Sequence, residues 1–349
     1  MAYASITKPG LHFNNKLYAG ANKSVTGIGF QPDFVWIKER DSGYHALFDA
    51  VRGVTKLISS NANSVESTAS DTLTAFGADG FTLGADSNNY VGGSSTDVAS
   101  WNWKAGGGQG SSNTDGSINT TYTSANTTSG FSISKYTGTG SNATVGHGLG
   151  VAPKIVITKQ LGQSRSWAVF HQSIGHNKAM FLDTTAAADS DTSYWNDTSP
   201  TTTTFSLGTR DEMNKNAGVY IAYCFAEKKG FSKIGRYVGT GANDGAFVYC
   251  GFKPAWILRK CSSGGTAENW VINDNRRPGF NQSQLALFPN NTNAEDTATH
   301  NAVDFLSNGF KVRTNDGRTN ADAKTYLYMA FAENPLVANV GNSIPTTAE

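Results

Sequence analysis

The amino-acid sequence predicts an all-β chain of three tandem, homologous β-sandwich domains with a jelly-roll-like strand arrangement. The first observation behind this fold class is that one series of motifs occurs three times. Its proline-containing motif reads GFQPDFVWIK, GLGVAPKIVITK and GFKPAWILRK, and its closing motif reads SWNWKAG, YIAYCFAEKKG and YLYMAFAENP. Each copy spans about 100 residues, well above the roughly 20–50 residues of solenoid repeats, so each is long enough to form a small domain.

The second observation is the alternating pattern of short apolar runs, combined with a scarcity of helical patterns. Residues 34–38, 167–170 and 326–331 are rich in aromatic, aliphatic and β-branched side chains. Such runs, bounded by Gly, Asn, Asp and Pro, are typical of the strands of a sandwich or barrel. Because few windows show the i, i+3, i+4 apolar spacing of a helix, we expect short strands throughout the chain.

A proline precedes the most apolar segment of each copy. Pro32, Pro153 and Pro254 are expected at the first residue of a strand, where no ladder N–H is required. This strand and the closing aromatic strand are apolar along most of their length, so we expect them side by side in the buried part of a sheet. Equivalent or neighbouring buried positions are predicted for Trp36, Ile155 and Trp256.

The motif positions divide the chain into an N-terminal arm, three sandwiches, a linker and a tail. The arm is 1–12, the sandwiches are 13–105, 130–229 and 230–335, the Gly/Ser/Thr-rich linker is 106–129, and the C-terminal tail is 336–349. We expect a flexible linker because glycine-rich segments bury little surface, although an edge strand around residues 117–123 stays open. The junction between the second and third sandwiches is short, so these two should pack closely, with the first apart or offset.

The composition excludes several classes of partner. Charged residues make up only 16% of the 349 residues, and the formal net charge is +1, so the chain has no basic footprint for nucleic acid. No stretch approaches the roughly 18–20 apolar residues of a membrane span, and the first residues lack the apolar core of a signal peptide. We therefore expect neither nucleic-acid binding nor membrane insertion.

Residue types that carry chemistry form no recognisable site. Cys224, Cys250 and Cys261 lack the C-x₂-C spacing of a zinc site, and a disulfide between Cys250 and Cys261 stays open. The histidines are scattered, the Gly-x-Gly turns are not followed by Lys-Ser/Thr, and no two carboxylates stand out as a glycosidase pair. We therefore expect no catalytic residue, no metal and no cofactor.

Two copies share an aspartate that is followed three positions later by an arginine. These pairs are Asp49 with Arg52 and Asp274 with Arg277, whereas the second copy carries His171 at the corresponding place. A repeated Asp…Arg pair most often stabilises a turn through hydrogen bonds and an ion pair. We expect this structural role here.

The segments that differ between copies are the candidates for contact with a partner, because the repeated residues serve the scaffold. These segments are 41–45, 187–200 and 275–283, and their candidate contact residues are Tyr44, Trp195, Arg276, Arg277 and Phe280. Exposed aromatic and arginine side chains suit stacking on sugars and contacts at interfaces. The alternative, in which each loop aromatic folds back on its own domain, stays open.

Long motifs over nearly the whole chain resemble a family of virion repeat proteins from marine tailed bacteriophages. They include GFQPDFVWIKERDSGYHALFDAVRGVTK, DTLTAFGADGFTLG, YIAYCFAEKKGFSKIGRYVGTG and DGAFVYCGFKPAW. Proteins of this kind are described as tail-fibre-like or as other parts of the virion. The resemblance implies a non-enzymatic structural protein, foremost a tail-fibre or appendage component that contacts the host surface.

Two other roles stay open beside this one. A decoration or cement protein on the capsid exterior is the main alternative, because the chain contains no coiled-coil shaft or collagen-like repeat. A tail protein that depolymerises polysaccharide comes third. The implied partners are other virion proteins of the tail or capsid, a host surface glycan or protein, and further copies of the chain, with a trimer favoured. The implied location is the virion, assembled in the host cytoplasm.

Overall fold

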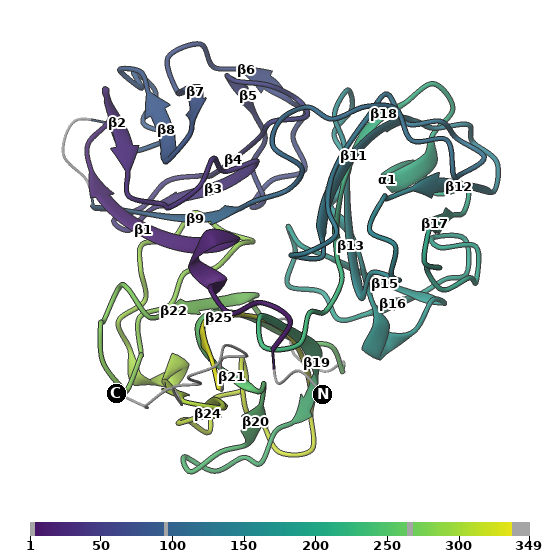
Figure 1. Ribbon diagram of the computed structural model, residues 1–349. Coiled ribbons are helices and arrows are strands. Elements are labelled where there is room, and N and C mark those ends of the chain that lie inside the picture. Colours follow the sequence, from purple (N-terminus) through teal and green to yellow (C-terminus); the bar gives the residue numbers. More distant parts are fainter. Residues whose placement is uncertain (1–3, 94–96, 264–267, 337–349) are drawn as a thin grey trace.

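The structure, a computed structural model, describes residues 4–93, 97–263 and 268–336, and its regular secondary structure is almost entirely antiparallel β-sheet. The prediction of an all-β chain is confirmed. Figure 1 shows three lobes around a common centre, which we call lobe 1 (13–105), lobe 2 (106–229) and lobe 3 (230–335). Helix within the described residues is limited to α1 (Asp211–Asn214) and to the 3₁₀ turns η1 (Pro9–Leu11), η2 (Gln172–Ile174) and η3 (Thr299–Asn301). Residues 337–349 of the predicted tail and 1–3 of the arm lie outside the described residues.

Lobe 1 contains a four-stranded sheet in the order β1-β9-β3-β4 and a three-stranded sheet in the order β2-β8-β7. A short pair, β5-β6, lies beside them. The bounds are β1 (Phe13–Ala19), β2 (Lys23–Thr26), β3 (Phe34–Glu39), β4 (His45–Asp49), β5 (Lys56–Leu57), β6 (Ser67–Thr68), β7 (Leu73–Gly77), β8 (Gly80–Leu83) and β9 (Asp97–Trp103).

Lobe 2 has the corresponding order β11-β18-β13-β14, extended by β10 at one edge and by β15 and β16 at the other, and a second sheet β12-β17. Its bounds are β10 (Tyr122–Asn126), β11 (Phe131–Thr137), β12 (Ala143–Gly146), β13 (Ile155–Gln160), β14 (Ala168–His171), β15 (Lys178–Phe181), β16 (Asp189–Ser190), β17 (Thr204–Leu207) and β18 (Val219–Phe225). The large sheets of lobes 1 and 2 thus share a core of four strands in the same order.

Lobe 3 contains the sheets β19-β25-β21-β22 and β20-β24-β23, which again match the orders of lobe 1. Its bounds are β19 (Ser232–Val238), β20 (Phe247–Tyr249), β21 (Phe252–Cys261), β22 (Val271–Asp274), β23 (Val303–Leu306), β24 (Gly309–Val312) and β25 (Thr325–Pro335). In every lobe the first strand of the shared four-strand core (β1, β11 or β19) pairs with the last strand (β9, β18 or β25), so the chain closes each lobe before it enters the next.

The strand after each proline pairs with the closing strand, as predicted. β3 pairs with β9, β13 with β18, and β21 with β25. The predicted core residues are buried, with Trp36 2%, Ile155 4% and Trp256 0% exposed. The position expected for the prolines, at the first residue of a strand, was wrong: Pro32 and Pro153 lie two residues before β3 and β13, and Pro254 lies inside β21, at a shift in the strand register. A proline is tolerated there because an irregular position in the ladder does not need its N–H.

Both faces of each large sheet are buried, and they face different cores. In β3, Phe34 and Trp36 belong to a cluster that draws side chains from all three lobes. Val35 and Ile37 alternate with them and pack inside lobe 1, against the small sheet. Because successive side chains of a strand point to opposite faces, this alternation gives each lobe its own core and a share of a common one.

Three aromatic rings meet in the common core, one from the closing strand of each lobe. Their centroids are 6.3 Å apart for Trp103 and Phe225, 5.7 Å for Trp103 and Phe331, and 6.0 Å for Phe225 and Phe331. The sides of this triangle are nearly equal, and all three rings belong to the core cluster that draws on all three lobes. The expectation that the first sandwich sits apart or offset was wrong, because lobe 1 contributes to this core as fully as the others do.

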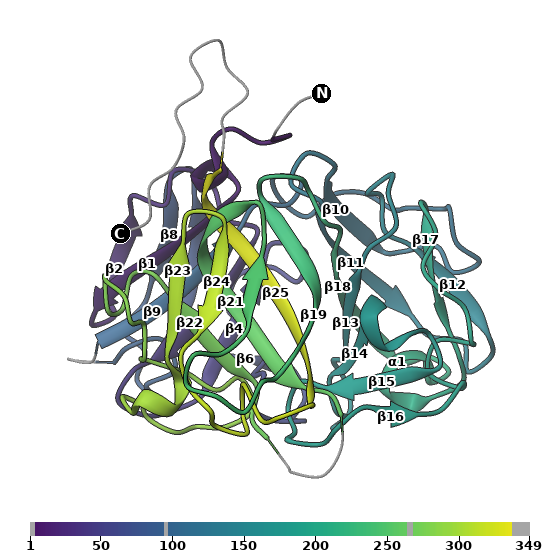
Figure 2. The same ribbon diagram turned by 90° about the horizontal axis from the view of Figure 1, so that it is seen from below.

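The segment expected to be a flexible linker is structured. The amides of Ala105, Gly107 and Gly108 donate to the carboxylate of Asp33 at 2.7–2.9 Å. Further along, β10 adds an edge strand to β11. The N-terminal segment is also attached, because Ser5 N donates to Lys229 O at 2.9 Å. Figure 2 shows this segment at one end of the lobes. Long-range hydrogen bonds therefore order segments whose composition alone favours flexibility.

Backbone hydrogen bonds close the seam between each pair of lobes. They run from Gly43 N to Thr292 O (3.1 Å), from Glu66 N to Leu161 O (2.9 Å) and from Ala188 N to Ser262 O (3.4 Å). Each bond joins loops of two different lobes, and together they link lobe 1 to lobe 3, lobe 1 to lobe 2, and lobe 2 to lobe 3. The loops between strands are therefore held relative to one another.

Candidate functional site

The loop 275–283 leaves the large sheet of lobe 3 at the end of β22, where a buried carboxylate holds its base. Asp274 Oδ1 accepts hydrogen bonds from the backbone amides of Arg276 (3.0 Å) and Arg277 (3.1 Å). Asp274 Oδ2 accepts from Arg277 Nε (2.7 Å) and, across the seam, from Trp101 Nε1 (3.0 Å). Charge-assisted bonds of this kind fix the direction in which the loop departs.

The same arrangement occurs in lobe 1, where Asp49 pairs with Arg52 and accepts a bond from Tyr223 O–H of lobe 2 at 2.7 Å. Burial and the Asp49 carboxylate raise the pKa of Tyr223 well above its usual value, so its hydroxyl remains a donor. The predicted structural role of the two Asp…Arg pairs is confirmed. Both pairs are buried side chains that lie at seams between lobes.

Two of the predicted contact residues are not on the surface. Arg277 is 7% exposed and bonds to Asp274 and to Glu295 (3.1 Å), so its guanidinium is fully engaged. Trp195 is 2% exposed, packs edge-on against Phe170, and donates from Nε1 to the Lys178 carbonyl at 3.1 Å. The expectation that these side chains reach a partner was wrong. Each satisfies its polar groups and its apolar surface within the chain.

The other three predicted contact residues are exposed, but they do not all come together. Tyr44 is 48% exposed, and its ring lies 6.1 Å from that of Tyr90, near the seam of lobes 1 and 3. Arg276 and Phe280 are exposed on the loop 275–283 and line one groove, which Tyr44 does not line. At 73%, Phe280 has the greatest exposure of the large apolar side chains in the described chain.

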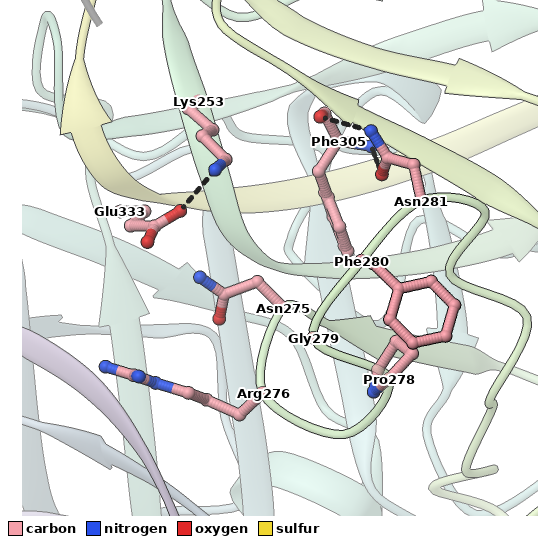
Figure 3. A pocket seen from close by; sticks show the side chains of 9 residues that line it. All are labelled: Lys253, Asn275, Arg276, Pro278, Gly279, Phe280, Asn281, Phe305 and Glu333. Atoms are coloured by element: carbon pink, nitrogen blue, oxygen red, sulfur yellow. Dashed lines mark hydrogen bonds and ion pairs between the residues drawn. The ribbon is translucent and has the colours of Figure 1, made fainter. Parts of the chain in front are cut away.

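This groove has a volume of about 290 Å³ and lies between the loop 275–283, the start of β21 and the end of β25 (Figure 3). Its lining residues are Lys253, Asn275, Arg276, Pro278, Gly279, Phe280, Asn281, Phe305 and Glu333. Lys253 Nζ and Glu333 Oε2 form an ion pair of 3.2 Å across the two paired strands. The groove therefore has a rigid wall of paired strands opposite an exposed loop.

The far end of the loop is fixed as firmly as its base. The side chain of Asn281 donates from Nδ2 to Phe305 O (3.0 Å) and accepts at Oδ1 from Phe305 N (2.9 Å), as Figure 3 shows. These two bonds tie the residue after Phe280 to β23. Both ends of the loop are thus anchored, so its backbone has a defined conformation. This conformation holds the side chain of Phe280 in solvent.

The charges of the groove leave one cation without a partner. The lining contains two cations, Lys253 and Arg276, and one carboxylate, Glu333. Lys253 is paired with Glu333, whereas the guanidinium of Arg276 forms no ion pair within the described part of the chain. An arginine with a free planar fork suits a carboxylate, which it can bind through two parallel bonds. The groove therefore favours an anionic group at this point.

The sequence predicted the loop 275–283 as a candidate contact segment but did not predict the opposite wall of the groove, to which Lys253 and Glu333 belong. Lys253 stands just before the proline of β21, and Glu333 belongs to the FAE motif that ends the closing strand. In lobe 2 the equivalent Glu227 pairs with Lys154 at 2.9 Å. The signal was available, because FAE is repeated and a lysine adjoins each of these prolines. It becomes useful only once the two strands are known to be neighbours.

The described residues form neither a cluster of metal ligands nor a disulfide. Within them, no group of three or more His, Cys, Asp and Glu side chains is placed to share a metal ion. Cys224, Cys250 and Cys261 are all buried and free, so Cys250 and Cys261 do not pair. None of the helices in the described ranges has the length and apolar character that a membrane span requires.

A protein-family model matches most of the chain. The model of a family described as a domain of unknown function (DUF7483) matches residues 8–335, which include all three lobes. No curated protein and no solved structure matches the chain. Since the match covers nearly the whole chain, this protein belongs to the DUF7483 family.

Proposed function

We propose that this chain is a non-enzymatic structural protein of a tailed-bacteriophage virion, and that it serves as a tail-fibre or appendage component that contacts the host surface. The sequence motifs that resemble virion repeat proteins run through all three lobes and support the first part. The groove beside the loop 275–283 carries the second part. There, Phe280, the most exposed large apolar side chain of the described residues, and Arg276, which has no ion-pair partner among them, lie on one anchored loop.

The rest of the molecule suits a role in contact, because it holds this loop still. An exposed phenyl ring costs hydrophobic free energy in water, and a partner that covers it removes this cost. A loop that is ordered beforehand loses little conformational entropy on binding. Asp274 and Asn281 provide this order at the two ends of the loop. A fixed aromatic residue and a fixed cation together form the kind of surface that binding interfaces use.

The proposal is tested by substituting Phe280→Ser in the phage and measuring both virion incorporation and host adsorption. We expect adsorption to fall by about tenfold or more, with incorporation unchanged, since about 1.4 kcal/mol of lost contact corresponds to a factor of ten. Phe247→Ser is the matched control, because Phe247 is also an exposed phenylalanine but lies on β20, away from the groove. Adsorption that stays normal in both variants would contradict a host-contacting role for this loop.

A decoration or cement protein on the capsid is the second candidate, and the triangle of Trp103, Phe225 and Phe331 favours it. Three lobes with the same strand order around one centre form a body that fits a local threefold position without forming a trimer of chains. Labelling the protein on intact particles separates the two roles: label on the head supports decoration, and label on the tail supports the appendage role. If Phe280→Ser reduced incorporation rather than adsorption, the loop would serve assembly.

A further inference from the structure

The groove of lobe 3 combines three kinds of contact at different points along its length. Figure 3 shows Phe280 and Arg276 projecting in different directions from the loop, with Asn275 between Arg276 and Lys253. Asn275 Oδ1 accepts a bond from Asn15 Nδ2 at 3.1 Å, which orients the amide. Its NH₂ group donates no hydrogen bond within the described residues. An apolar face, an amide donor and a guanidinium therefore line the same groove.

This arrangement disfavours a peptide as the ligand. Peptides that bind by strand addition need a free sheet edge, but the groove lies at the ends of β21 and β25, which are paired with each other in the interior of their sheet. Peptides that bind as helices need an apolar trough. Here the apolar lining is small, since Phe305 is 3% exposed and only Phe280 and Pro278 remain.

A sugar ring matches the same features closely. One face of a pyranose presents C–H groups that stack on an aromatic ring, while its hydroxyls accept and donate hydrogen bonds. The exposed ring of Phe280 offers the stacking surface, and Asn275 offers a donor for a hydroxyl. Because Arg276 is the one cation of the groove without an ion-pair partner in the described chain, a carboxylate on the sugar is the matching charge.

We propose that this groove binds an acidic oligosaccharide, with a uronic-acid carboxylate on Arg276 and a neighbouring sugar ring stacked on Phe280. Because Arg276 and Phe280 project in different directions from the loop, as Figure 3 shows, a ligand that contacts both must be longer than one sugar. The proposal rests on the proposed role in host contact, for which it names the chemical class of the receptor.

The test uses the purified full chain and a panel of uronic-acid oligosaccharides, with carboxyl-reduced forms of the same compounds as neutral probes. Binding is measured by calorimetry and by ligand-observed NMR. We expect saturable binding of at least one acidic compound and at least tenfold weaker binding of its reduced form, because hydrogen bonds to charged groups are worth more than neutral ones. The absence of saturable binding across the panel, or equal affinity for acidic and reduced forms, overturns the proposal.

Two substitutions assign the contacts. Arg276→Gln should weaken the acidic ligand about tenfold and leave the reduced ligand unchanged, whereas Phe280→Ser should weaken both. Arg236→Gln and Phe247→Ser are matched controls, because these side chains are exposed outside the groove. All four side chains are on the surface, so melting temperatures should be retained. Equal losses in Arg276→Gln and Arg236→Gln would show nonspecific charge attraction and overturn the assignment.

The saccharide-binding test and the host-adsorption test can fail independently of each other. If the saccharide binds but virions with Phe280→Ser adsorb normally, the ligand class stands and the role in host contact fails. If adsorption is lost but no acidic saccharide binds, the role in host contact stands and the ligand class proposed here is wrong.

Discussion

The seam between lobes 1 and 2 and the seam between lobes 2 and 3 place different polar groups at the same position of the fold. At the first, Asp49 ends β4 and accepts a hydrogen bond from Tyr223 of the neighbouring lobe. At the second, His171 ends β14 and lies 3.4 Å from the backbone oxygen of Tyr328. The third seam, with Asp274 and Trp101, follows the first pattern.

The residue across the seam accounts for this difference. Tyr223 and Trp101 carry a donor, and the position that corresponds to them on β25 is Met329, which carries none. A buried aspartate opposite a methionine would lack that bond. His171 is itself the donor through Nε2, and its Nδ1 accepts from Ser173 N at 3.1 Å. The polar group at each seam is therefore matched to the hydrogen-bonding capacity of its neighbour.

The largest expected effect comes from the core that all three seams share. Phe331→Ala removes one ring of the central triangle and should lower the free energy of unfolding by roughly 3–5 kcal/mol, the range for buried aromatic residues. Phe225→Ala should behave alike, since its ring occupies the corresponding position. Denaturant unfolding followed by tryptophan fluorescence measures the loss. A change below about 1 kcal/mol would show that these rings are not part of a shared core.

Breaking an Asp–Arg seam should be about as damaging. Arg52→Met leaves the buried carboxylate of Asp49 without its cation and is expected to cost about 3–5 kcal/mol. The matched change at the histidine seam, His171→Leu, removes a neutral hydrogen bond and should cost only about 1 kcal/mol at pH 7. Denaturant unfolding of the two variants is the measurement. Equal losses would contradict the distinction between charged and neutral seams.

Acid should weaken the histidine seam. Burial, with a smaller effect of Lys154, lowers the pKa of His171 to about 4, whereas an unfolded histidine has a pKa of about 6.5. Between these values the unfolded chain binds a proton that the folded chain excludes, so stability is complete above pH 6.5 and falls as the pH decreases toward 4. This loss should reach about 2 kcal/mol at pH 5 and be absent in His171→Gln. If the wild type and His171→Gln lost stability in parallel as the pH falls, His171 would not be the source of this acid sensitivity.

Removing a single bond across an Asp seam should have a smaller effect. Tyr223→Phe deletes the hydroxyl that donates to Asp49 and should cost about 1.5–2 kcal/mol, toward the lower end for bonds to charged groups. Tyr122→Phe, at a partly exposed tyrosine of β10, is the control and should change stability by less than about 0.5 kcal/mol. Thermal melts of both variants compare the two changes. A loss no larger than that of the control would show that the Tyr223 hydroxyl does not stabilise the seam.

The smallest expected effect is that of chelation. EDTA should leave the melting temperature unchanged, because the seams within the described chain consist of side-chain and backbone bonds. A shift of several degrees would instead indicate a stabilising cation, with the loop at residues 293–296 as the first place to search.

The sequence predicted the strands and part of the site because both depend on local patterns. Alternating apolar runs predicted the paired strands β3 and β9, and the difference between copies pointed to the loop 275–283, which lines the groove. Trp195 shows where such reasoning ends: its polar neighbours suggest an exposed loop, but Phe170 and the Lys178 carbonyl, distant in sequence, bury it. Burial of a loop aromatic depends on what the rest of the chain places beside it.

Three lysines near the ends of β3, β13 and β21 show the same contrast between local pattern and tertiary contact. The repeated motifs alone put Lys38, Lys159 and Lys260 at the same point of three similar strands, because motif and strand alternation are local properties. The complete burial of all three lysines depends instead on contacts between lobes. Burial lowers the pKa of each to about 8. The physical reason is that the second face of each sheet is covered by the other two lobes, and no local pattern in one lobe specifies what another lobe will cover.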